Sequence, residues 1–110
     1  MIEQFAEKMI RKKVSEGDFD ITQHALERMA EREIAIDKVL DCIITEKTIE
    51  FQIDRRTNDI KVLFQEAADK KPEVYTVVAA LETPLIITVC RTKEEVWESI
   101  NNVLRRRERY

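Results

Sequence analysis

The sequence predicts an α+β protein: an antiparallel sheet of four to five strands packed by two helices, with an additional helix at the N-terminus and another at the C-terminus. Three observations predict this fold class. Apolar residues recur at helical spacing as far as residue 44, they alternate with polar residues between residues 48 and 90, and helical spacing returns from residue 92. The 110 residues fit a single domain.

The N-terminal half contains three predicted helices and one short strand. An apolar stripe over residues 1–16 indicates the first helix, which ends before Gly17, the only glycine. Residues 18–21 alternate briefly and favour a short strand. Thr22 is placed to cap the second helix through its hydroxyl group, and a break at residues 33–35 separates that helix from a third one. The two central helices can hide their apolar stripes against each other and the sheet.

Four strands are predicted in the second half. Residues 48–54 and 60–64 alternate on either side of a polar turn, which indicates a hairpin with one solvated face. Residues 74–81 are almost continuously apolar, as in a central strand, and residues 85–90 form another β-branched run. A capping-box pattern then opens the predicted C-terminal helix, residues 92–108. Its apolar stripe contains Val96, Trp97, Ile100, Val103 and Leu104.

The composition is that of a charged globular protein. Hydrophobic residues make up 44% and charged residues 37%, and no apolar run approaches the roughly 18 residues of a membrane span. The first residues lack the pattern of a signal peptide, so we expect a cytoplasmic protein that does not bind membranes. One histidine and two separated cysteines cannot build the usual zinc sites, and we expect no metal and no cofactor. Cys42 and Cys90 lie in apolar segments typical of buried, reduced thiols.

The balance of charge limits how the protein could bind nucleic acid. The formal net charge is −3, whereas proteins that bind nucleic acid over a broad face usually carry a positive surplus. Any such binding would therefore need a local patch. Basic clusters occur at residues 8–13, at Arg55 and Arg56 in the predicted hairpin turn, and at residues 105–109. Runs of this kind are more often solvated surfaces than binding sites.

The second helix carries the most informative local arrangement. His24, Arg28 and Arg32 are spaced four residues apart and therefore line one side of that helix. A histidine exchanges a proton near neutral pH, and an arginine holds phosphate oxygens through parallel hydrogen bonds. Together they could cleave RNA, with the histidine as general acid or base and the arginines neutralising the developing charge. The alternative is a helix-start histidine beside an ordinary charged face, which the spacing alone favours.

Two residues on the later strands are further candidates. The hydroxyl of Tyr75 could reach one rim of the sheet and take part in catalysis, although a strand tyrosine is more often a core aromatic with a satisfied hydroxyl. Arg91, at the end of the last strand, could project beside that rim and bind nucleic acid, or serve as a surface charge. Arg55 and Arg56 complete the set of candidate nucleic-acid-binding residues.

The segment ITQHALERMAEREI, residues 21–34, followed by Asp37, Lys38 and Val39, resembles the domain-of-unknown-function 4258 family. Its members have a His-Ala-x-x-Arg-Met-x-x-Arg-Gly-Ile helix after a short strand, then a Ser-capped helix and a run of strands. The resemblance covers residues 18–91. Here Glu33 replaces the usual glycine, Ala35 the serine cap, and Cys90 a terminal tyrosine.

This family looks like a relative of the RelE/ParE toxin superfamily, so the resemblance implies a RelE-like fold. It also implies contact with RNA and a metal-independent endoribonuclease activity, in which the ribose 2′-hydroxyl is the nucleophile, and neutralisation by an antitoxin partner. The alternative is a non-catalytic interaction module of the same fold, which would bind a partner protein or a second copy of itself through the two terminal helices. The sequence identifies neither the substrate nor the partner.

Overall fold

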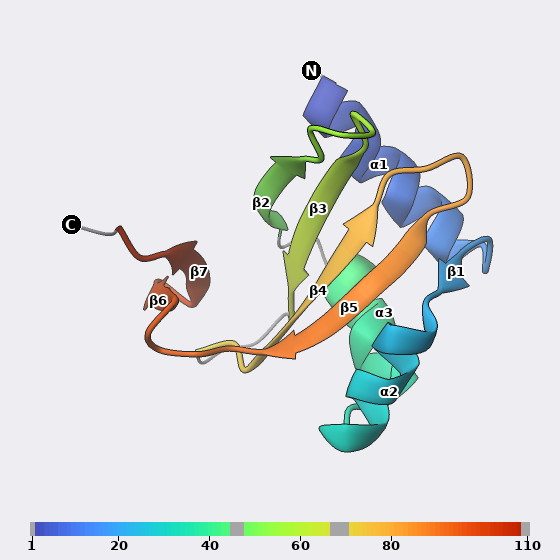
Figure 1. The fold of residues 1–110 in the computed structure, drawn as a ribbon. Coiled ribbons are helices and arrows are strands. Elements are labelled where there is room, and N and C mark those ends of the chain that lie inside the picture. The colour runs from blue at the N-terminus through green and yellow to red at the C-terminus, as the bar shows by residue number, and fades with distance from the viewer. Residues whose placement is uncertain (1, 45–47, 67–70, 109–110) are drawn as a thin grey trace.

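The computed structural model describes residues 2–44, 48–66 and 71–108, and Figure 1 shows its helices, its main sheet and a separate hairpin. The elements follow in the order α1 (Ile2–Ser15), β1 (Asp20–Ile21), α2 (Gln23–Glu31), α3 (Ile36–Ile44), β2 (Thr48–Ile53), β3 (Ile60–Gln65), β4 (Val74–Ala79), β5 (Leu85–Arg91), β6 (Trp97–Ile100) and β7 (Val103–Arg106). The α+β class, the N-terminal helix and the order of elements as far as β5 are confirmed.

The main sheet has five strands in the order β1-β5-β4-β3-β2, and it is mixed rather than purely antiparallel. Strands β2 to β5 pair antiparallel with their neighbours, but β1 pairs parallel with β5, with Asp20 opposite Leu85. The prediction of an antiparallel sheet is therefore wrong at this edge. Alternation within a segment reveals that it is a strand, but it carries no information about which strand lies beside it or in which direction.

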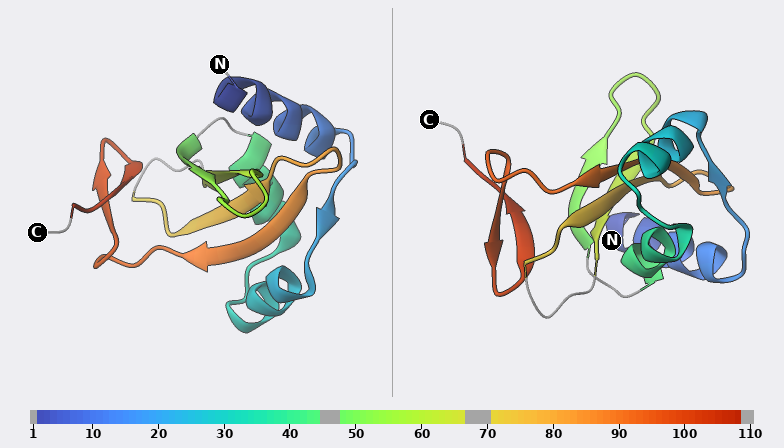
Figure 2. Two further views of the ribbon diagram at one scale, coloured as in Figure 1. Left: turned by 45° about the horizontal axis from the view of Figure 1, so that its top comes forward. Right: turned by 90° about the horizontal axis from the view of Figure 1, so that it is seen from below.

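The three helices and one face of the sheet enclose the larger core. Helices α1 and α3 pack against each other and on β3 and β4, while α2 packs against β5 (Figure 2). Alternate strand residues such as Val62, Phe64 and Val78 meet the buried helix residues Ile10 and Val39. The helical stripes read from the sequence account for this packing, because residues at i, i+3 and i+4 share one face of a helix.

Both ends of α2 follow from local chemistry. The side chain of Thr22 accepts a hydrogen bond of 3.0 Å from the N–H of Ala25, as predicted. At the other end Glu33 adopts a positive φ of 54°, and the N–H of Ile34 donates to the carbonyl of Met29 at 2.9 Å. This is a Schellman ending, in which the left-handed position usually holds glycine. The turn is therefore formed although glutamate occupies it.

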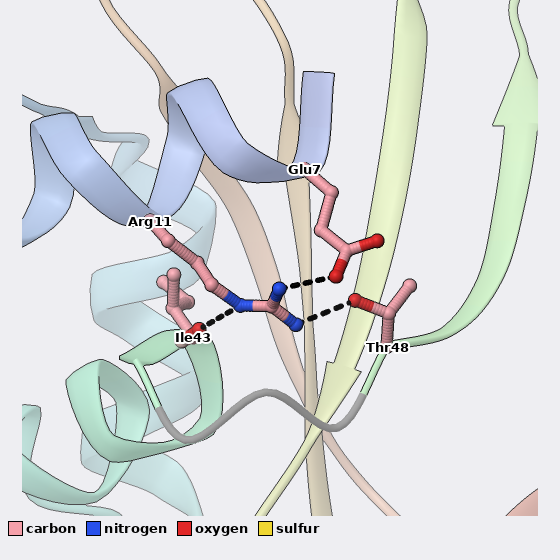
Figure 3. A network of polar contacts seen from close by, with 4 residues as sticks. All are labelled: Glu7, Arg11, Ile43 and Thr48. Atoms are coloured by element: carbon pink, nitrogen blue, oxygen red, sulfur yellow. Dashed lines mark hydrogen bonds and ion pairs between the residues drawn. The ribbon is translucent and has the colours of Figure 1, made fainter. Parts of the chain in front are cut away.

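Arg11 ties α1 to the rest of the fold (Figure 3). Its Nε donates to the carbonyl of Ile43 at 3.1 Å, one Nη donates to the hydroxyl of Thr48 at 2.9 Å, and the other pairs with Glu7. The guanidinium also lies 5.4 Å from the ring centroid of Phe64. One partly buried cation thus joins α1, the end of α3 and the start of β2.

The predicted C-terminal helix, residues 92–108, is wrong: the segment forms the antiparallel hairpin β6–β7. Asn101 and Asn102 have φ values of 53° and 61°, the left-handed conformations that a type I′ hairpin turn requires. The supposed apolar stripe divides between two faces, with Trp97 and Leu104 buried but Ile100 and Val103 exposed. Over so short a segment, the spacing of the apolar residues fits a helix as well as a hairpin. The asparagine pair was the feature of the sequence that favoured the hairpin.

The hairpin docks on the face of the sheet opposite the helices. Trp97 and Leu104 form a second, smaller core with Leu63, and Tyr75 packs against it. The fully buried amide of Gln65 holds the turn and β7, donating to the carbonyl of Asn102 at 2.8 Å and accepting from the N–H of Leu104 at 2.6 Å. Figure 1 shows this unit beyond the C-terminal end of β5.

Replacing Asn101 and Asn102 together by alanine distinguishes the two folds of this segment. In a helix, alanine is the better former, and the change would stabilise the protein. In the hairpin, two residues with a Cβ would be forced into the left-handed region without the local hydrogen bonding of asparagine, at about 1–2 kcal/mol each. We expect urea denaturation to show a lower free energy of unfolding. An increase would contradict the hairpin, and Asn101→Gly with Asn102→Gly is the matched control that should retain stability.

Within residues 2–44, 48–66 and 71–108, no helix is long and apolar enough to cross a membrane.

Candidate nucleic-acid interface

A pocket of about 390 Å³ lies where the end of α2, strands β4 and β5, and the C-terminal hairpin meet. Figure 1 shows the end of β5 between α2 and the hairpin. The pocket is lined by four cationic residues, one phenol, one thiol and two apolar side chains: Arg32, Arg91, Lys93, Arg106, Tyr75, Cys90, Val96 and Trp97. We call it the arginine–tyrosine pocket.

Strand pairing places the centre of the pocket. Tyr75 on β4 lies directly opposite Cys90 on β5, and both side chains project from the face that does not pack on the helices. The ring of Tyr75 meets the buried indole of Trp97 edge-on, with the ring centroids 5.1 Å apart at an angle of 62°. The phenol is therefore held by an aromatic pair on one side and by the neighbouring strand on the other.

Arg32 and Arg91 form the wall on the α2 side. A guanidinium nitrogen of Arg32 donates to the carbonyl of Val89 at 2.6 Å, and one of Arg91 donates to the carbonyl of Arg32 at 2.5 Å. These bonds fasten the C-terminal end of α2 to the edge of β5. They also leave part of each guanidinium for other acceptors, because an arginine has five N–H donors.

Arg106 forms the wall on the hairpin side. Its guanidinium lies 4.6 Å from the centroid of the Trp97 ring and pairs with both carboxylate oxygens of Glu50, at 2.8 and 2.9 Å. Stacking and the two-point ion pair fix its orientation. Hydrogen bonding from Arg106 lowers the pKa of Glu50, so that carboxylate stays charged and keeps the cation in place at neutral pH.

The pocket is cationic although the whole chain is acidic. Its lining contains four positive side chains and no carboxylate, and only Arg106 among the four is paired with an acid in the part of the chain that the structure describes. Burial raises the pKa of the Tyr75 hydroxyl, with a further rise from the neighbouring Cys90. At neutral pH the phenol is therefore protonated and able to donate a hydrogen bond or a proton.

The structure brings three of the predicted site residues together and leaves four apart. Arg32, Tyr75 and Arg91 line the arginine–tyrosine pocket. His24 is exposed on α2 outside this lining, and Arg28 pairs with Glu31 on the same helix. Arg55 and Arg56 are exposed in the turn between β2 and β3. The roles predicted for these four residues stay predictions.

Two pocket residues that carry charge were not among the candidates. Lys93 precedes the hairpin, and Arg106 belongs to the basic run that the sequence shows at residues 105–109. In the expected helix, residue 106 would have had no reason to face the sheet. The register of the hairpin sets Arg106 opposite Trp97 and so places the Arg106 side chain on the face that points toward Tyr75. Recognising the asparagine turn would have supplied that register.

The cysteines are both free, as predicted, but only one of them is fully buried. Cys42 lies in the core, where burial raises the pKa of its thiol to about 12. Cys90 is half-buried and lines the pocket, so the prediction of a buried thiol is wrong for this residue. The reason is that β5 exposes alternate residues on the face that the hairpin covers only in part.

Residues 21–91 match the family described as Domain of unknown function (DUF4258). The chain belongs to this family. The match contains α2, α3 and strands β2 to β5, and therefore Arg32, Tyr75, Cys90 and Arg91 of the pocket. Helix α1 and the β6–β7 hairpin, which supplies Arg106, lie outside it. The chain matches no curated protein and no solved structure.

Proposed function

We propose that this DUF4258 chain is a RelE-like domain that binds RNA at the arginine–tyrosine pocket and cleaves it without a metal ion. The observation that carries the proposal is the gathering of Arg32, Arg91, Lys93 and Arg106 around the Tyr75 hydroxyl, with no carboxylate among the described residues of the lining. Phosphate contacts supply most of the affinity in nucleic-acid complexes, and a local cationic pocket provides them despite the net charge of −3.

The residues of the pocket fit the charge that develops during such cleavage. Attack of the ribose 2′-hydroxyl, which loses its proton to solvent water, forms a bond from the 2′ oxygen to the adjacent phosphorus and places additional negative charge on the phosphate oxygens. The bond from phosphorus to the 5′ oxygen of the next nucleotide breaks, and that oxygen leaves. Guanidinium groups already oriented by protein acceptors stabilise that charge with little reorganisation. Arg32 and Arg106 are oriented in this way, by Val89 and Glu50. Tyr75, protonated at neutral pH, is the group that would give its proton to the leaving oxygen.

A second candidate function is binding of a partner protein. The predicted C-terminal helix, on which half of that idea depended, is a docked hairpin. The exposed side chains of Ile2 and Phe5 on α1 still favour an apolar contact, with 64% and 74% of their surfaces accessible. RNA binding is the better-supported function, because its candidate residues converge on one pocket whereas these two lie on an open helix surface.

The experiment measures binding and cleavage of a fluorescein-labelled single-stranded RNA at rising salt concentration. Affinity should fall with a logarithmic slope of roughly 0.7 for each phosphate contacted. Tyr75→Phe should lower the cleavage rate by about 100-fold or more and leave affinity nearly unchanged. His24→Ala is the matched control, for which we expect no change in either quantity.

Binding that does not respond to salt, or no binding, would refute the RNA proposal. Cleavage lost in His24→Ala but retained in Tyr75→Phe would move the chemistry to the outer side of α2. Salt-sensitive binding without any cleavage would limit the function to RNA binding.

A further inference from the structure

The two edges of the main sheet differ in how far other segments of the chain cover them. On the β5 side, β1 covers the first residues, and side chains of the α2 region take the next carbonyls: the Thr22 hydroxyl donates to Ile87 at 2.8 Å and Arg32 donates to Val89 at 2.6 Å. On the other side, β3 is the only described strand that forms the sheet with β2 (Figure 1), and β7 contacts β2 through Arg106 and Glu50, ahead of Phe51 and Ile53. An open strand edge is a template for a further strand, which proteins usually cover or disrupt.

The register identifies which backbone groups of β2 point outward. In the β2–β3 hairpin the N–H of Asp54 donates to the carbonyl of Asp59. Hydrogen-bonded pairs alternate with non-hydrogen-bonded pairs along an antiparallel hairpin, so the next hydrogen-bonded pair is Gln52 with Lys61. The N–H and C=O groups of Phe51 and Ile53 therefore face away from β3. No hydrogen bond to these four groups is formed among the described residues. The side chains of the same two residues are exposed, by 36% and 60%.

Positive charge at one end of the β2 edge indicates the direction in which an added strand would run. Arg55 and Arg56 follow β2 in the turn, both exposed, and neither has an ion pair with a described residue. These arginines are not part of the arginine–tyrosine pocket. A strand added antiparallel to β2 would begin beside this turn, so acidic residues at its N-terminal end would lie near the two guanidinium groups.

We propose that β2 accepts an extended peptide segment of another protein as a sixth, antiparallel strand, with apolar residues beside Phe51 and Ile53 and acidic residues near Arg55 and Arg56. A second copy of the chain fits this edge less well in the register that would pair Phe51 with Ile53 of the copy. The centred two-fold register, with Phe51 opposite Ile53 of the copy, would set Glu50 directly opposite Asp54 in both halves, and like charges so placed are destabilising. This inference does not depend on the proposed RNA binding.

The test uses a synthetic peptide, Asp-Asp-Thr-Val-Thr-Val-Thr, carrying fluorescein at its C-terminal end, and measures its fluorescence anisotropy with the full chain. Ile53→Pro removes one outward N–H that β3 does not use, a change that edge strands tolerate. We expect it to weaken binding by roughly ten-fold or more. Ile53→Thr keeps the N–H and is the matched control, with an expected change below about three-fold.

Further comparisons make each outcome decisive. Arg55→Glu with Arg56→Glu should weaken this peptide but not one whose aspartates stand at the C-terminal end. Hydrogen exchange of the wild-type chain should show the Phe51 and Ile53 amides unprotected when free and protected when the peptide is bound, which tests the proposal even if Ile53→Pro does not fold. No saturable binding by the wild-type chain at 1 mM peptide, roughly the weak limit of specific recognition, would overturn the proposal. So would equal binding by folded Ile53→Pro, or a dimer of the chain alone that Ile53→Pro abolishes.

Discussion

Replacing Arg91 and Lys93 together by glutamate is expected to lower the affinity for single-stranded RNA by at least about ten-fold at 50–100 mM salt. These two cations are the pocket residues least involved in holding the fold. Lys93 is exposed and its side chain makes no hydrogen bond within the described ranges, and Arg91 is exposed with one bond to the end of α2. Reversing both charges should replace the attraction of an RNA phosphate by repulsion, and it should not leave a cavity in the core.

The matched control changes the same charge elsewhere. Arg55→Glu with Arg56→Glu also lowers the net charge by four, but in the turn between β2 and β3, outside the pocket. A general effect of net charge would lower RNA affinity equally in both double variants, whereas a pocket effect lowers it mainly in the first. Circular dichroism establishes that both are folded. If the turn variant lost as much affinity as the pocket variant, the candidate interface would be wrong.

The accuracy of the sequence interpretation depends on the distance over which each signal acts. Thr22 as a helix cap and the break around Glu33 were predictable, because a cap or turn is decided within a few residues. The alternation in β2 and β3 was readable for the same reason. The parallel pairing of Asp20 with Leu85 was not, since it joins residues far apart in the chain and neither segment encodes its neighbour.

The candidate site shows the same division. Arg32 was singled out from its spacing with His24 and Arg28, yet its place in the pocket comes from its bond to Val89 on β5. The helical register that grouped the three residues reports a shared side of α2, and only tertiary packing decides which of them reaches the sheet. Arg106 was missed because its position depends on a hairpin whose turn residues were read as part of a helix.

Truncating Trp97 to alanine should have the largest effect on stability, lowering the free energy of unfolding by about 3–5 kcal/mol. The indole is 1% exposed, packs against Tyr75 and lies under the guanidinium of Arg106. Its removal leaves a cavity between the hairpin and the sheet. Because Trp97 is the only tryptophan, unfolding is followed by circular dichroism rather than by fluorescence.

Ile100→Ala supplies the control, and the pair of variants tests the fold of the whole segment. In a helix, residues 97 and 100 would share one stripe, and both truncations would be costly. In the hairpin Ile100 is 47% exposed, away from Trp97, so its truncation should cost less than about 1 kcal/mol. Trp97→Ala should also weaken RNA binding, because loosening the hairpin displaces Arg106 from the pocket, whereas Ile100→Ala should not. Equal losses of stability in the two variants would contradict the docked hairpin and, with it, the hairpin wall of the arginine–tyrosine pocket.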